Sequence, residues 1–259
     1  MKRLMQYYII SGKVVETRRS YLSVRTVRKT RGTRRAGASS AKKIGLNEKQ
    51  EALRLARILN TNFGTGGYLL TLTFAPERLP ETFEALCDCG EKLMRKLRAR
   101  CRKQGIELLR VLIPANWNPK EDRPARFHLH IVINEIPLDL LQGLWPSAEL
   151  DIKGLRSGDL TNLAVYLYRN VKADPGRKHW YASRNRAKPV YSEPQEVTEA
   201  EGIEPMPGAK DIYQEPTRDE DGRVVGSYLR CTLPEPPKIR GGQIILPKPP
   251  KRGGRKNGA

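Results

Sequence analysis

The feature that most constrains this chain is the run from Arg126 to Asn134, in which two of its three histidines stand on either side of one leucine. The run is apolar and rich in β-branched side chains, so it predicts a strand. Because side chains alternate between the faces of a strand, the odd-numbered residues from Phe127 to Ile133 build core on one face. His128 and His130 then lie side by side on the other face.

Two adjacent neutral imidazoles can bind one divalent metal ion, because their ring nitrogens can converge on a single point. This pattern therefore indicates a candidate metal site at His128 and His130. The alternative is a solvated strand face that carries two polar rings.

Charge points to the class of partner. The chain of 259 residues has a formal net charge of +20 and a pI near 10, which favours a polyanion, with nucleic acid ahead of an anionic membrane surface. We find no apolar stretch near the ~18 residues needed to span a bilayer and no signal peptide, so we expect no membrane partner and a cytoplasmic location. The four cysteines are too few and too unevenly placed to predict a disulfide framework.

Uneven composition predicts one domain with appendages. Residues 1–45 form a basic arm with a possible hairpin, made by 7–15 and 21–27, before a cluster of arginines at 25–35 that either binds phosphates or only adds solubility. Residues 46–190 form the domain, and 191–222 form an acidic flexible linker. We expect a last strand in 223–235 and a disordered basic tail in 236–259.

Periodicity predicts the elements of the central domain. Helices are expected at 47–62, with Asn47 as N-cap, at 81–104, at 137–144 and at 160–172. Strands are expected at 68–74, 107–113, 127–133 and 148–152, with the second and third joined as a hairpin with an enlarged turn. The fold class is therefore α+β, with a central antiparallel sheet and helices packed on one face.

The helix expected at 160–172 carries two tyrosines on the shoulders of its apolar stripe. Periodicity does not decide whether Tyr166 or Tyr168 faces the histidines, and either ring could simply flank the core. A metal ion can polarise a phosphodiester, and a tyrosine can attack its phosphorus. Such a combination would make a nuclease that joins itself to DNA.

Several ordered motifs within residues 46–190 carry a resemblance to a known family. They are Asn62-Phe63-Gly64 with Leu70–Phe74, Phe127–Asn134, Leu144-Trp145, Gly158-Asp159-Leu160, Val165–Arg169 and Trp180–Asn185. Together they resemble the HUH endonuclease superfamily, and in particular the rolling-circle replication initiators of bacterial plasmids and filamentous-phage-like elements.

The resemblance implies that Tyr166 is the nucleophile and that Arg169 stands where the family usually has lysine. Arginine offers a cation but does not readily release a proton, so an acid–base role at this position is in doubt. Tyr168 with Lys172 is the competing assignment.

The resemblance also implies a divalent metal ion, Mg2+ or Mn2+, on His128 and His130. The stretch that usually supplies a third ligand, Leu112-Ile113-Pro114, offers no side-chain oxygen, so Glu107, Asn116 or water would replace it. His179 is expected to face DNA or solvent rather than the metal. The residues expected to contact DNA are Thr71, Thr73, Trp180, Arg184 and Asn185.

The function that this resemblance implies is nicking of single-stranded DNA at a replication origin, leaving a 5′-phosphotyrosine and a 3′-hydroxyl. A host polymerase would extend that hydroxyl, and a host helicase would separate the strands because the chain lacks a Gly-x-x-x-x-Gly-Lys-Ser/Thr loop. The alternatives are a conjugative relaxase or single-tyrosine transposase, and a non-catalytic nucleic-acid-binding protein.

Overall fold

The computed structural model describes residues 2–23, 41–145, 149–172, 177–198, 203–219, 221–240 and 243–245. The chain divides into two compact units. One unit, formed from both ends of the chain, comprises residues 1–39 and 190–259, and the other comprises residues 40–189. The second unit coincides to within six residues with the domain predicted at 46–190.

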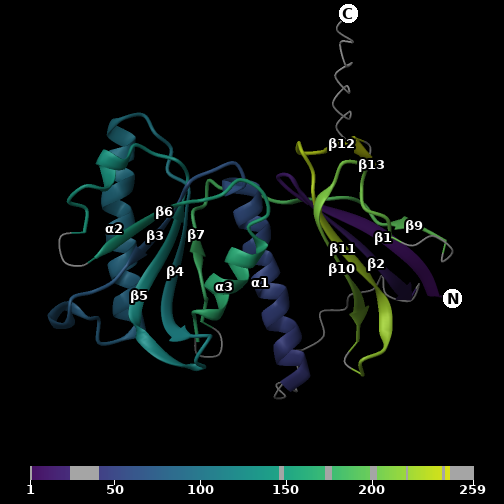
Figure 1. The fold of residues 1–259 in the computed structure, drawn as a ribbon, viewed down its shortest axis with the longest axis horizontal. Coiled ribbons are helices and arrows are strands. Elements are labelled where there is room, and N and C mark those ends of the chain that lie inside the picture. Colours follow the sequence, from purple (N-terminus) through teal and green to yellow (C-terminus); the bar gives the residue numbers. More distant parts are fainter. Residues whose placement is uncertain are drawn as a thin grey trace, which may run out of the picture. The chain divides into compact units, whose positions relative to one another are not determined.

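A five-stranded antiparallel sheet forms the centre of the 40–189 unit (Figure 1). Its strands, in spatial order, are β6 (Leu150–Gly154), β3 (Tyr68–Leu72), β5 (Arg123–Ile133), β4 (Arg110–Asn118) and β7 (Tyr181–Ala182). β5 contains both histidines and lies in the middle of the sheet. The α+β class and the antiparallel central sheet predicted from the sequence are confirmed.

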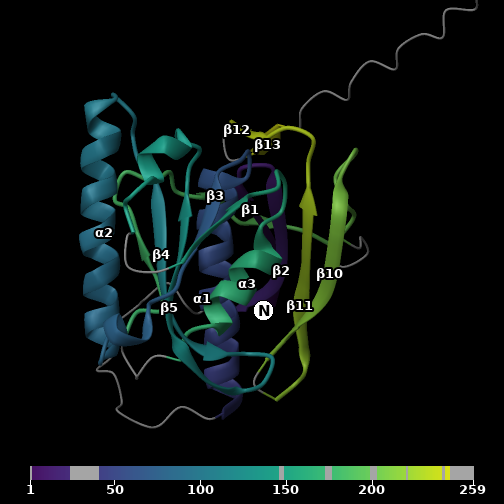
Figure 2. The same cartoon turned by 60° about the vertical axis from the view of Figure 1, so that its left-hand side comes forward.

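Three α-helices pack on this sheet: α1 (Ala41–Phe63), α2 (Phe83–Lys103) and α3 (Thr161–Arg169). α2 packs on the face that carries Leu112 and Leu129, whereas α1 and α3 pack on the face that carries Val111 and Val132 (Figures 1 and 2). The helices were expected on one face, and the structure has them on both. The reason is that β4 and β5 carry apolar side chains at successive positions over part of their length, so both faces need cover.

Local sequence explains where α2 begins. Thr82 caps α2, since its side chain accepts a hydrogen bond from the backbone N–H of Ala85 at 3.1 Å. α1 begins at Ala41, so Asn47 lies within the helix and is not its N-cap as expected. The helix expected at 137–144 is a 3-10 turn at Leu138–Leu141, and another such turn spans Pro76–Arg78.

The hairpin of β4 and β5 is confirmed, but its turn is shorter than expected. β4 continues through Trp117 to Asn118, which pairs with Arg123. A shift of register between Ala115 and Trp117 lets the polar segment stay in the strand.

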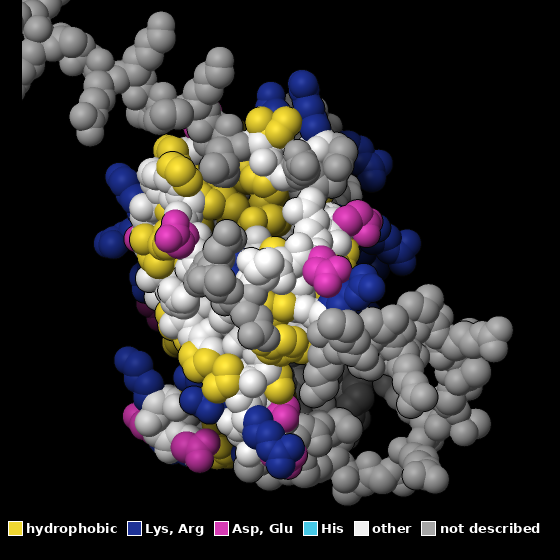
Figure 3. All heavy atoms as spheres, turned by 90° about the vertical axis from the view of Figure 1, so that its right-hand side faces the viewer, with side chains coloured by type: hydrophobic (Ala, Val, Ile, Leu, Met, Phe, Trp, Pro, Cys, Tyr) yellow, Lys and Arg dark blue, Asp and Glu magenta, His cyan; other side chains and the backbone are white. Residues whose placement is uncertain are grey.

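The other unit contains a six-stranded antiparallel sheet. Its strands are β10 (Lys210–Arg218), β11 (Val224–Thr232), β2 (Val14–Ser23), β1 (Lys2–Ser11) and β8 (Val190–Tyr191), in that order, with β9 (Gln195–Glu196) also on β1. β12 (Lys238–Arg240) and β13 (Gln243–Ile245) form a separate hairpin. Figure 3 shows a face of this unit where hydrophobic side chains gather between polar ones.

The structure of this unit corrects several expectations for the chain ends and confirms one. The N-terminal hairpin turns at Gly12, inside the segment 7–15, because glycine readily adopts the positive φ of +63° found there. Residues 16–20, where the turn was expected, lie within β2. The acidic segment 191–222, expected to be a flexible linker, contains β9 and β10. The strand expected in 223–235 is confirmed as β11, and β12 and β13 occupy the start of the segment expected to be disordered. The arginine cluster at 25–35 and the end of the tail lie outside the described residues.

None of the described helices is both long and apolar enough to cross a bilayer.

Gly67 lies in the loop that connects α1 to β3, and its substitution tests how closely this loop approaches β5. Its φ is +134°, and a Cβ there would collide with the backbone carbonyl of Ile133. We expect Gly67→Ala to lower the free energy of unfolding by about 3 kcal/mol, which combines backbone strain with the collision. Urea unfolding followed by tryptophan fluorescence measures this, because all three tryptophans lie in the 40–189 unit.

Gly105→Ala is the matched control, because Gly105 also has a positive φ, +69°, but nothing lies within 4 Å of its Cβ position. It should cost only about 1 kcal/mol. Equal effects at the two positions would contradict the close approach at Gly67.

Candidate functional site

The two histidines of β5 converge through their Nε2 atoms, which lie 3.2 Å apart. The rings are nearly perpendicular, at 88°, with centroids 4.8 Å apart. Each ring is held at its other nitrogen. Nδ1 of His128 lies 2.8 Å from the backbone oxygen of Arg126, and Nδ1 of His130 lies 3.2 Å from Oγ1 of Thr71.

These contacts favour a lone pair on each Nε2. A carbonyl oxygen only accepts, so Nδ1 of His128 carries the proton and Nε2 of the neutral ring is free to coordinate. The hydroxyl of Thr71 can accept from Nδ1 of His130 in the same way. Burial, followed by the charges of His128 and Lys153, lowers the pKa of His130 to about 3, and burial lowers the pKa of His128.

This donor pair fits a divalent metal ion, because two neutral nitrogens aimed at one point repel each other unless a cation lies between them. Among the described residues, no group of three or more His, Cys, Asp or Glu side chains converges to complete a metal site. Water and substrate oxygens would have to supply the remaining ligands of an ion held by His128 and His130.

The structure contradicts the two side chains expected to replace the third ligand, Glu107 and Asn116, and leaves water as the remaining expected replacement. Glu107 lies too far from the histidines. Its backbone oxygen accepts a hydrogen bond from the side chain of Asn134, which is four residues beyond His130, about 13 Å along the strand. Asn116 bonds through both side-chain atoms to the backbone of Lys172.

Tyr166 faces the His pair from α3. Its ring centroid lies 6.0 Å from that of His130, and 43% of the residue is exposed. Buried Asn60 fixes the start of α3, since its side-chain oxygen accepts from the backbone N–H of Leu160 at 2.7 Å. Asn116 fixes the segment after α3 by the two bonds to Lys172. The helix is therefore held at both ends, which restricts where Tyr166 can lie.

The competing pair does not lie at the histidines of β5. Tyr168 is buried and stacks on His179 with ring centroids 4.5 Å apart. Burial, with a smaller contribution from the charges of Glu48 and Glu51, raises the pKa of Tyr168 to about 12. The ammonium of Lys172 lies 3.8 Å from the ring centroid of Trp117. Arg169, at the end of α3, is exposed.

Sequence reasoning missed two charged residues of β6. Asp151 pairs with Thr71, which in turn pairs with His130, so the three residues share one face of the sheet. The ammonium of Lys153, on the same face, lies 2.8 Å from a carboxylate oxygen of Asp151. The hydrogen bond and charge of Asp151, and more weakly Tyr166, raise the pKa of Lys153. The signal was the i, i+2 spacing of Asp151 and Lys153, but only the pairing of β6 with β3 brings them to the His pair.

The residues expected to contact DNA fall into two groups. Thr71 lies on β3 beside the histidines, and Thr73 lies just beyond the end of β3 and bonds weakly to the backbone oxygen of Glu149 at 3.5 Å. Trp180, Arg184 and Asn185 line a separate groove beside β7. In that groove, Asn185 donates to Glu107 at 2.8 Å, and His179 is stacked on Tyr168.

Comparisons with family models, with curated proteins and with solved structures found no match for this chain.

Thr71 provides a test of the metal site. We expect Thr71→Val to weaken Mn2+ binding about tenfold, because it removes the acceptor that keeps the Nε2 lone pair of His130 directed at the metal. Calorimetric titration of the DNA-free protein with Mn2+ measures the change. Thr73→Val removes the same group two residues further along the chain, just beyond β3, and should leave the affinity unchanged, so equal losses in the two variants would refute the role of Thr71.

Proposed function

We propose that this protein is a metal-dependent nicking enzyme for single-stranded DNA, of the HUH endonuclease type, in which Tyr166 is the nucleophile. The observation that carries the proposal is the approach of the Tyr166 ring to His130, 6.0 Å between centroids, beside two convergent imidazole nitrogens. A partly exposed phenol next to a metal-binding pair is the combination that attack on a phosphodiester requires.

In the proposed reaction, the phenolic oxygen of Tyr166 forms a bond to phosphorus as the bond from phosphorus to the 3′-oxygen breaks. The tyrosine proton is lost to solvent, and the departing 3′-oxygen takes up a proton. A metal ion on His128 and His130 would supply positive charge to the scissile phosphate. Lys153 adds a cation on the same face, and Asp151 holds it there.

Lys153 could supply the lysine ammonium that the chain lacks at position 169. The family that the chain resembles usually has a lysine three residues after the nucleophile, where this chain has Arg169. Lys153 would instead supply an ammonium from β6, a different element, while Tyr166 still comes from α3. Its exposure leaves it able to meet a substrate phosphate.

The biological role that follows is initiation of rolling-circle replication at an origin. The 5′-phosphotyrosine would conserve the energy of the broken bond, and the free 3′-hydroxyl would prime a host polymerase. The formal charge of +20 favours binding to the DNA backbone.

A covalent adduct is the direct test of this function. Incubation with labelled single-stranded DNA from the protein's own locus and Mn2+ should give a protein–DNA band on a denaturing gel. Tyr166→Phe should abolish the band, because the attacking oxygen is gone. Tyr168→Phe is the control and should retain it, since that ring stacks on His179. Loss of the band only in Tyr168→Phe would refute the assignment, and no band with any fragment of the locus would refute the enzyme.

Lys153 makes a further prediction about rate. We expect Lys153→Met to slow adduct formation about tenfold to a hundredfold, because charge developing at phosphorus loses a nearby cation. Mn2+ affinity should not fall, since the removed charge repels the metal. Arg169→Met is the matched control with the same loss of charge. A larger loss of rate in that variant would contradict the role given to Lys153.

A further inference from the structure

A groove of about 1260 Å³ runs beside β7, apart from the His pair. Of the described residues that line it, seven are arginines and one is lysine, against three glutamates. The glutamates already have partners. Glu51 pairs with Arg54, Glu91 pairs with Arg110, and Glu107 accepts from Asn185. Eight cations against three anions leave the groove with a net positive charge, although Arg54, Arg110 and Arg177 are paired with Glu51, Glu91 and Glu84.

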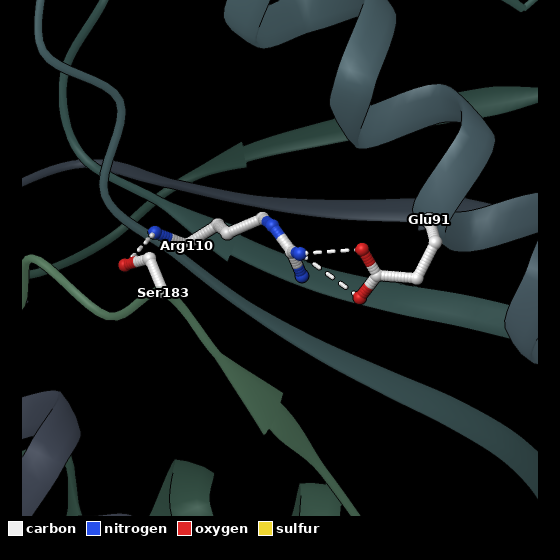
Figure 4. A network of polar contacts seen from close by, with 3 residues as sticks. All are labelled: Glu91, Arg110 and Ser183. Atoms are coloured by element: carbon white, nitrogen blue, oxygen red, sulfur yellow. Dashed lines mark hydrogen bonds and ion pairs between the residues drawn. The ribbon is translucent and has the colours of Figure 1, made fainter.

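Arg110 lies in the groove wall with an incompletely satisfied guanidinium (Figure 4). Its side chain is only 7% exposed, and its Nη2 donates to both carboxylate oxygens of Glu91, at 2.9 and 2.7 Å. Nε and Nη1 are buried and have no acceptor among the described residues. Glu91 is itself 42% exposed, so an anion entering from the groove can compete with its carboxylate for Arg110.

Aromatic rings accompany the positive charge. Trp180 and Tyr181 line the groove and are partly exposed, whereas Tyr168, which also lines it, is buried and stacked on His179. Cations that follow a backbone, combined with rings on which bases stack, are how proteins bind single strands without regard to sequence. The volume exceeds the roughly 300–1,000 Å³ of a small-molecule pocket, so it suits several nucleotides rather than one.

We propose that this groove is a second nucleic-acid site, which holds a single strand through its phosphates on the arginines and its bases on the rings. Arg110 pairs with Ile133, whereas His128 pairs with Ala115, so the two residues are separated by five residues of β4, about 17 Å along the strand, and lie on opposite faces of the sheet. The groove extends the proposed nicking function, but strand binding in it requires neither the metal nor Tyr166. Its arginines select anionic strands, and its rings select unpaired bases over duplex.

The test measures strand binding without cleavage. The full chain carrying Tyr166→Phe is mixed, in EDTA, with fluorescent oligo(dT) or oligo(U) of about twelve nucleotides or with the corresponding duplex, and anisotropy is followed. Both single strands should bind more tightly than the duplex, and the ratio of the two tells whether DNA or RNA is preferred. Because no metal or nucleophile is present, failure of the nicking proposal would leave this result untouched. Tighter binding of duplex would overturn the groove proposal.

Two arginines of α2 line the groove and are exposed, Arg98 and Arg102. The double variant Arg98→Ala with Arg102→Ala should weaken binding about tenfold and reduce the slope of log K against log salt by about 1.4, the value for two lost contacts to a single strand. The control is Lys92→Ala with Arg95→Ala, which removes the same charge from exposed positions on the same helix outside the groove. Equal losses in the two double variants would overturn the proposal.

Substitution of Glu91 tests the groove proposal by a predicted gain in affinity for the single strand. Glu91→Gln removes the anion that competes for Arg110, so binding should tighten about threefold or more. Asp88→Asn makes the same change of charge at an exposed position of α2 outside the groove, and it should have a smaller effect. Unchanged or weaker binding in Glu91→Gln would overturn the role of Arg110.

Discussion

The burial of β5 on both faces is the constraint on which the rest of the 40–189 unit depends. From Leu129 to Ile133 every residue is buried, with α2 on one side and α1 and α3 on the other. His130 is only 4% exposed within this run. A polar ring in that position must be neutral and hydrogen-bonded, and Thr71 on the neighbouring strand meets that need. The candidate site thus lies where the hydrophobic core ends along the strand.

The position of Tyr166 follows from polar anchors rather than from the helix itself. α3 has only nine residues, too few to be stable alone, so its place is set by what holds its ends. Asn60 and Asn116 do this from α1 and β4, and Leu167 and Ala164 pack into the core between them. If Tyr166 is the nucleophile proposed above, it would have little freedom to move relative to the His pair, and such restriction lowers the entropic cost of attack.

Local pattern predicted the parts of the fold that depend on local sequence. The strand that holds the histidines was predicted from alternation and the helix α2 from its helical period, both of which act over a few residues. Pairings between distant segments did not follow. β6 contributes Asp151 and Lys153 only because it lies beside β3, some eighty residues earlier, and β11 joins β2 from the other end of the chain. β10 was predicted to be part of a flexible linker because its acidic composition gives it a weak preference for a strand. Its pairing with β11 outweighs that preference.

The two tyrosines of α3 lie at different candidate sites. Two residues of helix separate them by about 200° around its axis, so Tyr166 turns to the His pair while Tyr168 lies in the wall of the groove. One short helix therefore contributes a ring to each candidate site. Arg110 and His128 are about 17 Å apart along β4 and lie on opposite faces of the sheet, so a nucleic-acid strand that reached both would have to pass round an edge of the sheet. A strand held in the groove would therefore have its scissile phosphate several nucleotides away, which would let binding and cleavage read different parts of the same DNA.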